Sequence, residues 1–436
     1  MTRHLQADVR FPKAAYRVSP VKTENMEKGC EQMKAIEVRN KIYWVGAVDW
    51  AIRDFHGYET PRGTSYNNYL VLDEEPTLVD TVKHDFADVT LKNIREIIDP
   101  GAIRHVIINH IENDHATSVD RVMAVCPGAT LYMTERGRKG LARFFDLSGW
   151  RIRTVKTGDT LKTGEKTLLF LETPMLHWPD SMVSYVQEDK VLFSQDAFGQ
   201  HIASSAHFDD EFIACASLAE LEDAVIDYYA NILMPFGPLI KAKIAEVAKL
   251  GLDLQVIAPD HGIIWRQDPE KIVRMYLDMA EGKATQSVAV IYDTMWRSTE
   301  YMTQSIVRGI KDAGLECKVI KLRATPISVA IKEFWKARGT LIGSPTLNNI
   351  PFPTIVQFLT YLRGLRARNR IVGAYGSFGW SGGAIREVYE TIRQIGLEAY
   401  EPGVEVMYRP APEDEQKCYD FGAAFAEKVK EYHARF

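Results

Sequence analysis

The chain has 436 residues, of which 46% are hydrophobic and 25% charged, and its formal net charge is −5. This length predicts two or three domains, and the composition is that of an ordinary globular protein, which excludes fibrous and low-complexity classes. The slight negative charge argues against nucleic acid as the main partner, because phosphate binding needs a basic face.

Cysteine usage and hydropathy exclude further classes. The five cysteines form no Cys-x-x-Cys pair, so thiolate-bound zinc, rubredoxin-type iron and iron–sulfur modules have no ligands here. The first 22 residues lack the apolar core of a secretion signal, and no run of 18 apolar residues is present. We therefore expect a soluble cytoplasmic protein with no membrane contact.

Residues 1–34 are polar and read as an N-terminal extension. From residue 35 the sequence contains stretches rich in β-branched residues, in which apolar and polar residues alternate. These are followed by apolar runs that each end in a polar loop. We expect strands in 35–48 with a turn at Arg39 and Asn40, two strands in 67–81, a helix at 88–98, strands at 105–110, 130–134, 166–174, 190–196 and 254–261, and a helix at 268–282. This order predicts a layered αβ/βα domain over residues 35–283.

From residue 287 the chain alternates regularly between strand and helix. Strands are expected at 287–294, 316–322, 339–345 and 370–377, and helices at 299–314, 328–338, 355–365 and 383–396. This βαβα order demands a parallel sheet with helices on both faces, so residues 287–436 are predicted to form one doubly wound domain. The boundary is expected at 281–286.

The strongest chemical signal directly follows the apolar strand at 105–110. It is the hexad His110-Ile-Glu112-Asn-Asp114-His115, with four potential metal ligands in six residues. Three further apolar strands are followed by His177, Asp196 and His261. Strand ends in an α/β layer share one edge, so these loops can converge. Placing so many polar groups after buried strands is costly unless they bind something.

Four imidazoles and three carboxylates suffice for two metal ions. Sulfur is absent, and oxygen ligands with imidazole suit iron or manganese, whereas pure imidazole sites suit zinc. A carboxylate can bridge two metals about 3.5 Å apart, and Asp196 is a candidate for that bridge. The other seven histidines lack this context; His201 is close enough to Asp196 to support the site, although a structural role for it is favoured.

The hexad, His177 in ETPMLHWPDSM, Asp196 in SQDAFG and His261 in PDHGIIWR resemble the metallo-β-lactamase-like domain of the flavodiiron proteins. Hydrolytic relatives carry His where this chain has Glu112, which favours iron and redox chemistry. The resemblance implies that His110, Glu112 and His177 hold one iron, that Asp114, His115 and His261 hold the other, and that Asp196 bridges. It extends from about residue 35 to the C-terminus.

The second domain offers three loops at the carboxyl ends of its strands, where ligands bind in doubly wound folds. The first opens onto a helix, and hydroxyl and backbone N–H groups there form an anion site that fits a mononucleotide phosphate. It is neither the G-x-G-x-x-G fingerprint nor a P-loop. The candidate residues are Thr294, Met295, Trp296, Ser298 and Thr299, then Ser344, Pro345, Thr346, Leu347, Asn348 and Asn349, then Ser377, Phe378, Gly379, Trp380, Ser381 and Gly382.

Together these loops resemble the FMN-binding flavodoxin-like domain of the same family. Arg297 departs from the family, where a small residue is frequent, and is left out of the predicted site. The resemblance implies an α/β protein with an N-terminal metallo-β-lactamase-like αβ/βα sandwich and a C-terminal flavodoxin-like parallel sheet. It also implies two irons and one FMN per chain.

The implied activity is reduction of dioxygen to water, of nitric oxide to nitrous oxide, or of both. The resemblance further implies a head-to-tail homodimer, with a tetramer as the alternative assembly, reduced by a separate rubredoxin or rubredoxin-like donor. Two alternatives stay open. One is a dinuclear zinc hydrolase with an accessory flavodoxin-like module, and the other is an electron carrier with an inactive metal domain.

Overall fold

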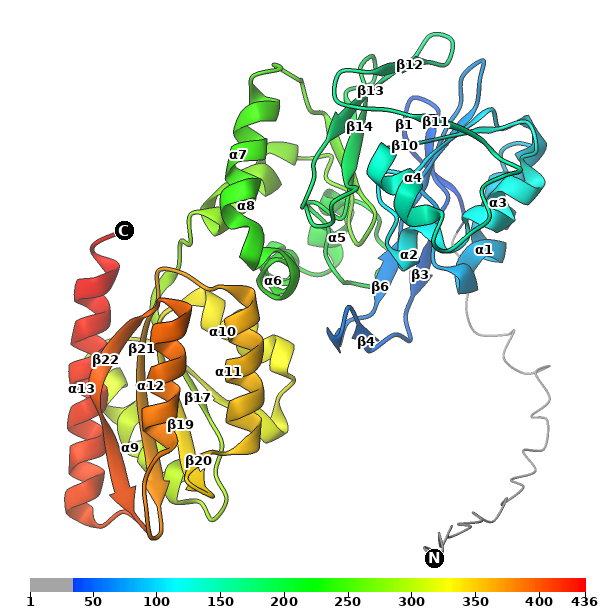
Figure 1. The fold of residues 1–436 in the computed structure, drawn as a ribbon. Helices are drawn as coiled ribbons and strands as arrows, with labels where there is room; N and C mark the ends of the chain where they lie inside the picture. The colour runs from blue at the N-terminus through cyan, green and yellow to red at the C-terminus, as the bar shows by residue number, and fades with distance from the viewer. Residues whose placement is uncertain (1–33) are drawn as a thin grey trace, which may run out of the picture. The chain divides into compact units, whose positions relative to one another are not determined.

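We analysed a computed structural model, in which residues 34–436 are described (Figure 1). Apart from Lys34, the predicted N-terminal extension lies outside the described residues. The first half of the described chain contains two sheets, and the second half contains one parallel sheet. Two short antiparallel pairs, β3 with β6 and β4 with β5, complete the set of strands.

The first sheet has the order β1-β2-β7-β8-β9-β10-β11, and its last four strands run parallel. The second has the order β12-β13-β14-β15-β16, with a parallel pair at the β15–β16 end. The strands are β1 (Ile36–Arg39), β2 (Ile42–Trp44), β3 (Ala47–Asp49), β4 (Asp54–Phe55), β5 (Tyr58–Glu59), β6 (Thr64–Tyr66), β7 (Tyr69–Val71), β8 (Thr77–Val79), β9 (His105–Ile107), β10 (Thr130–Met133), β11 (Arg151–Thr154), β12 (Thr160–Lys162), β13 (Thr167–Glu172), β14 (Met182–Val186), β15 (Val191–Gln195) and β16 (Val256–Pro259).

Aromatic rings fill the space between these two sheets. Tyr69 packs on Phe193 with ring centroids 5.0 Å apart, and Tyr132 stacks on Phe170 at 6.2 Å. Helices cover the outer faces, so the layers are helix, sheet, sheet, helix. The helices are α1 (Ala87–Arg95), α2 (Asn113–Ala116), α3 (Val119–Val125), α4 (Glu135–Leu141), α5 (Asp209–Cys215), α6 (Leu218–Tyr228), α7 (Gly237–Ala248) and α8 (Pro269–Ala280).

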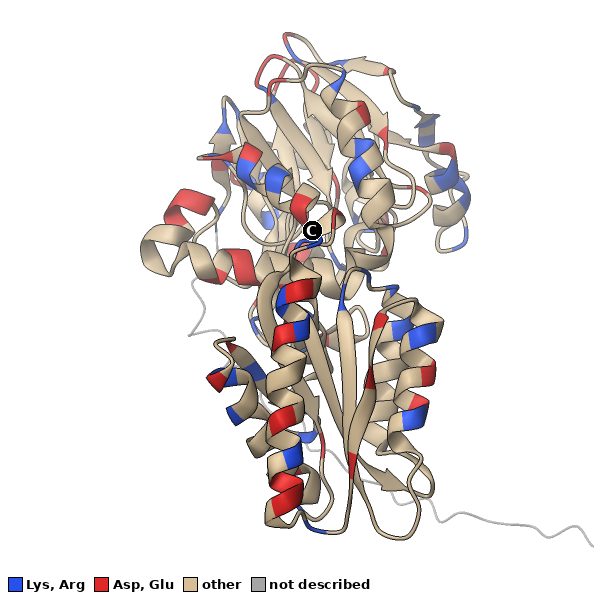
Figure 2. Cartoon of the chain, turned by 90° about the vertical axis from the view of Figure 1, so that its left-hand side faces the viewer, with Lys and Arg blue, Asp and Glu red and all other residues tan. Residues whose placement is uncertain are grey.

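The third sheet has the order β18-β17-β19-β21-β22, all parallel, and β20 adds an antiparallel pair to β19. Figure 2 shows charged residues gathered on its outer helices, while the strands between them are mostly uncharged. The elements are β17 (Thr285–Tyr292), α9 (Ser298–Asp312), β18 (Cys317–Lys321), α10 (Ile327–Lys336), β19 (Ala337–Leu347), β20 (Ile350–Pro351), α11 (Pro353–Leu365), β21 (Ile371–Phe378), α12 (Ala384–Ile395), β22 (Glu398–Met407) and α13 (Pro412–His433).

Helices α9 and α13 cover one face of this sheet and α10, α11 and α12 the other (Figure 1). Two glycines let α9 and α13 approach closely. A Cβ on Gly309 would lie 2.1 Å from the carbonyl oxygen of Tyr419, and one on Gly422 would lie 2.2 Å from that of Ile306. The cores on both faces are apolar, as a doubly wound sheet requires.

The expected α/β architecture is confirmed, with local differences. The first turn is one residue later than expected, because Asn40 and Lys41 take the positive φ angles. The strand expected at 339–345 runs on to Leu347, where it forms a hairpin with β20. A fifth strand and a final helix, β22 and α13, extend the expected alternation. The domain limits themselves stay a prediction, although α8 ends at Ala280 and β17 begins at Thr285.

Within residues 34–436, no helix combines the length and the apolar character that crossing a bilayer requires.

Candidate functional site

All seven predicted metal ligands converge at one edge of the two facing sheets. His110 and Glu112 follow β9, and Asp114 and His115 lie on the short helix α2. Three loops supply the rest: His177 lies between β13 and β14, Asp196 follows β15, and His261 follows β16. The sheet order places these strand ends side by side, which the spacing of the residues in the sequence does not reveal.

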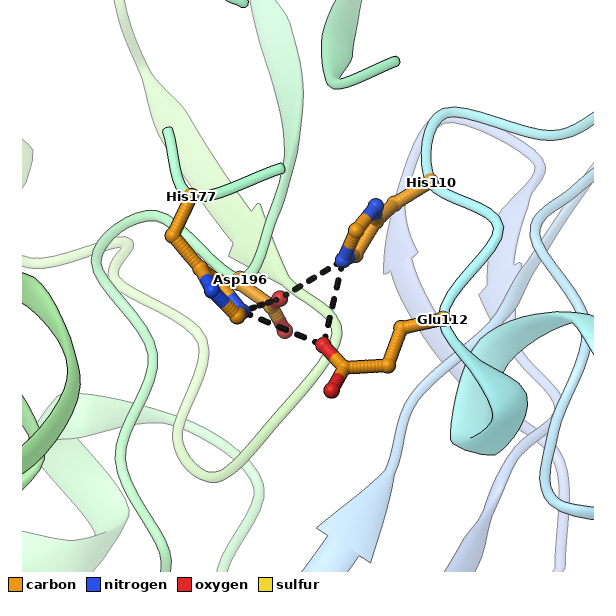
Figure 3. A group of neighbouring side chains, drawn as sticks. All are labelled: His110, Glu112, His177 and Asp196. Atoms are coloured by element: carbon orange, nitrogen blue, oxygen red, sulfur yellow. Dashed lines mark hydrogen bonds and ion pairs between the residues drawn. The ribbon is translucent and has the colours of Figure 1, made fainter. Parts of the chain in front are cut away.

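Four of the ligands form a first donor set (Figure 3). Nε2 of His177 lies 3.1 Å from Oε2 of Glu112 and 3.0 Å from Oδ2 of Asp196. Nε2 of His110 lies 3.2 Å from the same Glu112 oxygen and 3.3 Å from the same Asp196 oxygen. Two imidazole nitrogens and two carboxylate oxygens therefore point at one another across a small gap.

The remaining ligands form a second set on the other oxygen of Asp196. Oδ1 of Asp196 lies 2.9 Å from Nε2 of His115 and 3.4 Å from Nε2 of His261. Oδ2 of Asp114 lies 3.3 Å from the His115 nitrogen and 3.0 Å from the His261 nitrogen. Asp196 thus gives one oxygen to each set, which is the arrangement that a bridging carboxylate needs.

The donor spacing fits a coordinated ion better than it fits a set of hydrogen bonds. Metal–ligand bonds of about 2.1 Å place neighbouring donors roughly 3.0 Å apart in an octahedron and roughly 3.4 Å apart in a tetrahedron. Several of these buried atoms also have no hydrogen-bond partner among the described residues: Nε2 of His177, Nε2 of His261, Oδ2 of Asp196 and both Asp114 oxygens. Buried polar atoms without partners are rare, so the residues present fit two metal ions.

The electrostatics of the site show that it is built for cations. Burial opposes the charge on Asp196, but His115, His110 and His177 outweigh it and hold the pKa of this carboxyl well below its usual range. Burial likewise opposes charge on Glu112, yet His110 and His177 lower its pKa to about 2. The carboxylates in turn outweigh burial and raise the pKa of His177 to about 9. Without a metal, the carboxylates favour the protonated form of the His177 ring.

Oxygen atoms outside the ligand set contact Nδ1 of three ligand histidines and orient their rings, as is usual in metal sites. Nδ1 of His110 lies 3.3 Å from Oδ2 of Asp180, which also accepts the Ile111 N–H at 2.9 Å. Nδ1 of His115 lies 3.2 Å from Oδ2 of Asp260. Nδ1 of His261 lies 2.7 Å from the carbonyl oxygen of Ser65. Each of these three rings therefore presents Nε2 to the gap.

One residue at the site, His56, was not predicted from the sequence, and a second, His201, lies closer to the site than expected. His56, on the turn between β4 and β5, places Nε2 3.4 Å from Oε1 of Glu112. Its Nδ1 lies 3.4 Å from Nε2 of His201, and Nδ1 of His201 lies 2.9 Å from the hydroxyl of Thr64. No local signal marks His56, because it reaches the site only through the fold of a hairpin that precedes the hexad by more than 50 residues.

A cavity opens onto this centre. It has a volume of about 560 Å³, and its wall includes Phe55, His56, Glu112, Asp114 and Trp178. The side chains of Glu112 and His56 therefore line a cavity beside the donor sets. A small molecule that reaches the two donor sets from this side meets these two residues.

The candidate flavin residues also lie together, at the carboxyl ends of β17, β19 and β21. The hydroxyls of Thr299 and Ser377 are 2.9 Å apart, which joins the first loop to the third. Ser381 donates a hydrogen bond to the side chain of Asn349, which joins the third to the second. Ser344 is an exception: its hydroxyl accepts the Phe352 N–H at 2.8 Å and donates to the Pro345 carbonyl at 2.9 Å, so it is used within the fold.

This region fits a flavin mononucleotide on two observations. The hydroxyl of Thr294 is buried without a hydrogen-bond partner, beside the start of α9, which has no side-chain cap. An uncapped helix start offers N–H groups to a phosphate. Trp296 and Trp380 are 83% and 84% exposed, so two indole rings are free to lie against a flat ring. Arg297 instead pairs with Glu300 and stacks on Tyr301.

The cluster predicts a specific pH dependence for the metal-free chain. The pKa of His177 is raised to about 9 from 6.5, so its stabilising effect is complete below about pH 6.5 and lost as the pH rises through 9. The pKa of Glu112 is lowered to about 2 from 4.5, so its effect is present above about pH 4.5. The Tm of the metal-free protein should therefore be highest between these limits and fall toward pH 9.

Thermal unfolding by circular dichroism, with and without metal, checks this. The metal-loaded protein should not show the alkaline loss, because metal binding requires unprotonated rings. The control is His177→Gln, in which the alkaline decline should be smaller. A metal-free Tm that stays level or rises between pH 6.5 and 9 contradicts the prediction.

Comparison with known proteins agrees with the geometry. Residues 64–262 match the family described as ODP family beta lactamase, and residues 290–422 match the flavodoxin family. The chain is 42% identical to the nitric oxide reductase of Moorella thermoacetica, over 90% of this chain and 98% of the relative. It is 38% identical to the anaerobic nitric oxide reductase flavorubredoxin of Pectobacterium carotovorum, over 90% of this chain and 78% of the relative.

Solved structures extend the comparison to the fold. Rubredoxin oxygen:oxidoreductase from Desulfovibrio gigas has a TM-score of 0.88 at 37% identity, covering 92% of this chain and 100% of that one. The flavodiiron protein of Giardia intestinalis has a TM-score of 0.89 at 31% identity, covering 93% and 99%. The chain therefore belongs to the flavodiiron proteins, oxidoreductases that carry a non-haem diiron site and FMN.

Proposed function

We propose that this chain reduces dioxygen to water, nitric oxide to nitrous oxide, or both, at a diiron centre that receives electrons through FMN. The observation that carries the proposal is the division of Asp196 between two donor sets, with Oδ2 facing His110 and His177 and Oδ1 facing His115 and His261. In this proposal His110, Glu112 and His177 hold one iron, Asp114, His115 and His261 hold the other, and Asp196 bridges them.

Glu112 favours iron over the zinc alternative. Carboxylate ligands suit iron, and three carboxylates offset more positive charge than a site dominated by imidazole. Two ferrous ions and three carboxylates leave one net positive charge, which further oxidation increases. The carboxylate-rich set therefore favours a centre that changes its oxidation state. The alternative, a dinuclear zinc hydrolase, has no use for the flavin-type loops of the second domain.

The proposed cofactors account for the number of electrons that the reduction of dioxygen requires. When bound, FMN supplies up to two electrons and the two irons one each, which is the four that dioxygen needs to become two waters. The chain's own residues fix the geometry: Asp180, Asp260 and the Ser65 carbonyl orient the rings, and Phe55 and Trp178 line the entrance. Nε2 of His56 lies 3.4 Å from Oε1 of Glu112, and both side chains line the cavity through which a small substrate would enter.

For FMN, we propose that Thr294, Ser298 and Thr299 bind the phosphate with the first N–H groups of α9. Trp296 and Trp380 would lie against the isoalloxazine ring, with the loops at 344–349 and 377–382 around it. The support is the unpartnered hydroxyl of Thr294 and the exposure of both indoles.

The proposed partners are a second copy of the chain, arranged head to tail, and a rubredoxin-type donor. The donor is inferred from the names of relatives, such as rubredoxin oxygen:oxidoreductase and flavorubredoxin. The dimer would bring the flavin of one chain to the metal cavity of the other, and assembly into tetramers is a further possibility to measure.

The first test of the function is composition and turnover. The purified chain should contain about two irons and one FMN, and the reduced protein should consume dioxygen, nitric oxide or both in an anaerobic electrode cell. A chain that holds two zinc ions after iron-replete expression, shows no turnover with either gas and hydrolyses model esters would instead be a hydrolase.

The second test concerns the bridge. Asp196→Ala removes a ligand from both donor sets, so iron affinity should fall by at least about 100-fold while FMN content stays at the wild-type level. Iron analysis and the flavin absorbance measure the two independently. Asp189→Ala is the matched control, because Asp189 is a buried carboxylate at the opposite end of β15 from Asp196 and pairs with Lys166. Two tightly bound irons in Asp196→Ala would disprove the bridge.

The third test separates the flavin site from the metal site. The double variant Thr294→Ala with Ser298→Ala removes two proposed phosphate contacts, and each hydrogen bond to a charged phosphate contributes about 1.5 kcal/mol or more. FMN should therefore bind at least about 100-fold more weakly, with iron content unchanged. Fluorescence titration of the apoprotein with FMN gives the dissociation constant. An unchanged constant would place the phosphate elsewhere.

A further inference from the structure

A buried carboxylate behind His115 is not among the predicted metal ligands. Asp260 follows β16, immediately before His261, and its side chain is fully buried. Its Oδ2 lies 3.2 Å from Nδ1 of His115, on the side of the ring that faces away from the donor set. The opposite nitrogen, Nε2, lies 2.9 Å from Asp196 and 3.3 Å from Asp114.

The burial of Asp260 is best explained by its contact with the His115 ring. Among the described residues, neither of its oxygens has a partner in hydrogen-bonding geometry. Asp80, an equally buried carboxylate, shows the contrast: it accepts the backbone N–H and the side-chain amide of Asn109, both at 2.7 Å. A buried carboxylate without donors is costly, and the nearest group able to offset that cost is the His115 ring.

The other ligand rings are held differently. Asp180, behind His110, also accepts the Ile111 N–H, so it is stabilised even without the ring. His261 is held by a backbone carbonyl, which no side-chain substitution removes. Asp260 is therefore the carboxylate whose placement depends most on a single ligand of the second donor set.

We propose that Asp260 is a positioning residue that keeps His115 in the tautomer with hydrogen on Nδ1 and the lone pair of Nε2 toward the metal. It thereby sets the occupancy of the second iron position. The inference rests on the proposed diiron site and adds a residue outside its ligand set. A carboxylate behind a ligand histidine orients the ring and strengthens its binding, and its loss typically costs 10- to 100-fold in metal affinity.

The test is iron binding by the full chain with FMN bound. Iron is removed by anaerobic chelation, and rebinding of Fe²⁺ is measured by titration for the wild type, Asp260→Ala and Asp260→Asn. Asp260→Ala should bind one iron as the wild type does and the second about 10- to 100-fold more weakly. Asp260→Asn should be closer to the wild type, because the amide oxygen can still accept from Nδ1.

Two further variants separate positioning from packing. Asp209→Ala is the matched control: Asp209 is 2% exposed and accepts the Arg266 and Gln267 N–H groups, away from the ligands, so this variant should lose stability but keep both irons. Asp180→Ala should weaken the other iron, and the double variant with Asp260→Ala should weaken both. If Asp260→Ala does not fold, Asp260→Ser takes its place in the comparison with Asp260→Asn.

The outcomes are distinguishable. Wild-type affinity for both irons in Asp260→Ala overturns the positioning role, as does the same selective iron loss in Asp209→Ala. Equal losses in Asp260→Ala and Asp260→Asn also overturn it, because the tautomer argument requires partial rescue. A wild-type chain that rebinds fewer than two irons overturns the proposed function itself, whatever the variants do.

Discussion

The structure depends on one electrostatic constraint, the burial of several carboxylates and imidazoles within a few ångströms of one another. Asp196 and His110 have no exposed surface, and Asp114 is 5% exposed. Burial on this scale is costly for isolated charges, and the metal-free chain offsets it only by placing protons on the rings. Two divalent cations offset it more completely, because every donor atom then faces a positive charge. The bridge at Asp196 makes the two positions interdependent.

The fold meets this constraint by placing the buried ligands directly after the ends of strands. Buried strands β9, β15 and β16 have apolar side chains on both faces, and each changes to polar residues where it leaves the sheet. The backbone there is fixed by the ladder of hydrogen bonds, so short loops carry the ligands with little freedom. The parallel sheet of the second half uses the same device for its flavin loops. One physical arrangement, the polar edge of an apolar sheet, thus serves both proposed cofactors.

Much of this was predictable from the sequence. The hexad at 110–115 is dense enough to mark a metal site, and regular alternation of strand and helix after residue 287 predicts the doubly wound sheet. His177, Asp196 and His261 were found because each follows an apolar run. The seven side chains do lie together, although their roles as ligands stay a prediction until metal is measured.

What the sequence could not provide depends on tertiary proximity. His56 does not follow an apolar run in the chain, and only the β4–β5 hairpin brings it to Glu112. Asp260 falls within the strand expected at 254–261, and no sequence pattern marks its contact with His115, which joins residues 145 positions apart. Short strand β14 was also missed, because five buried residues between two polar loops carry little periodicity. In each case the contact that matters is set by the tertiary fold.

The most direct test of this account is anomalous diffraction from crystals of the iron-loaded protein, collected at the iron and zinc absorption edges. The account predicts two iron peaks about 3.5 Å apart, on either side of the Asp196 carboxylate. A single peak, or a pair that scatters only at the zinc edge, would contradict it.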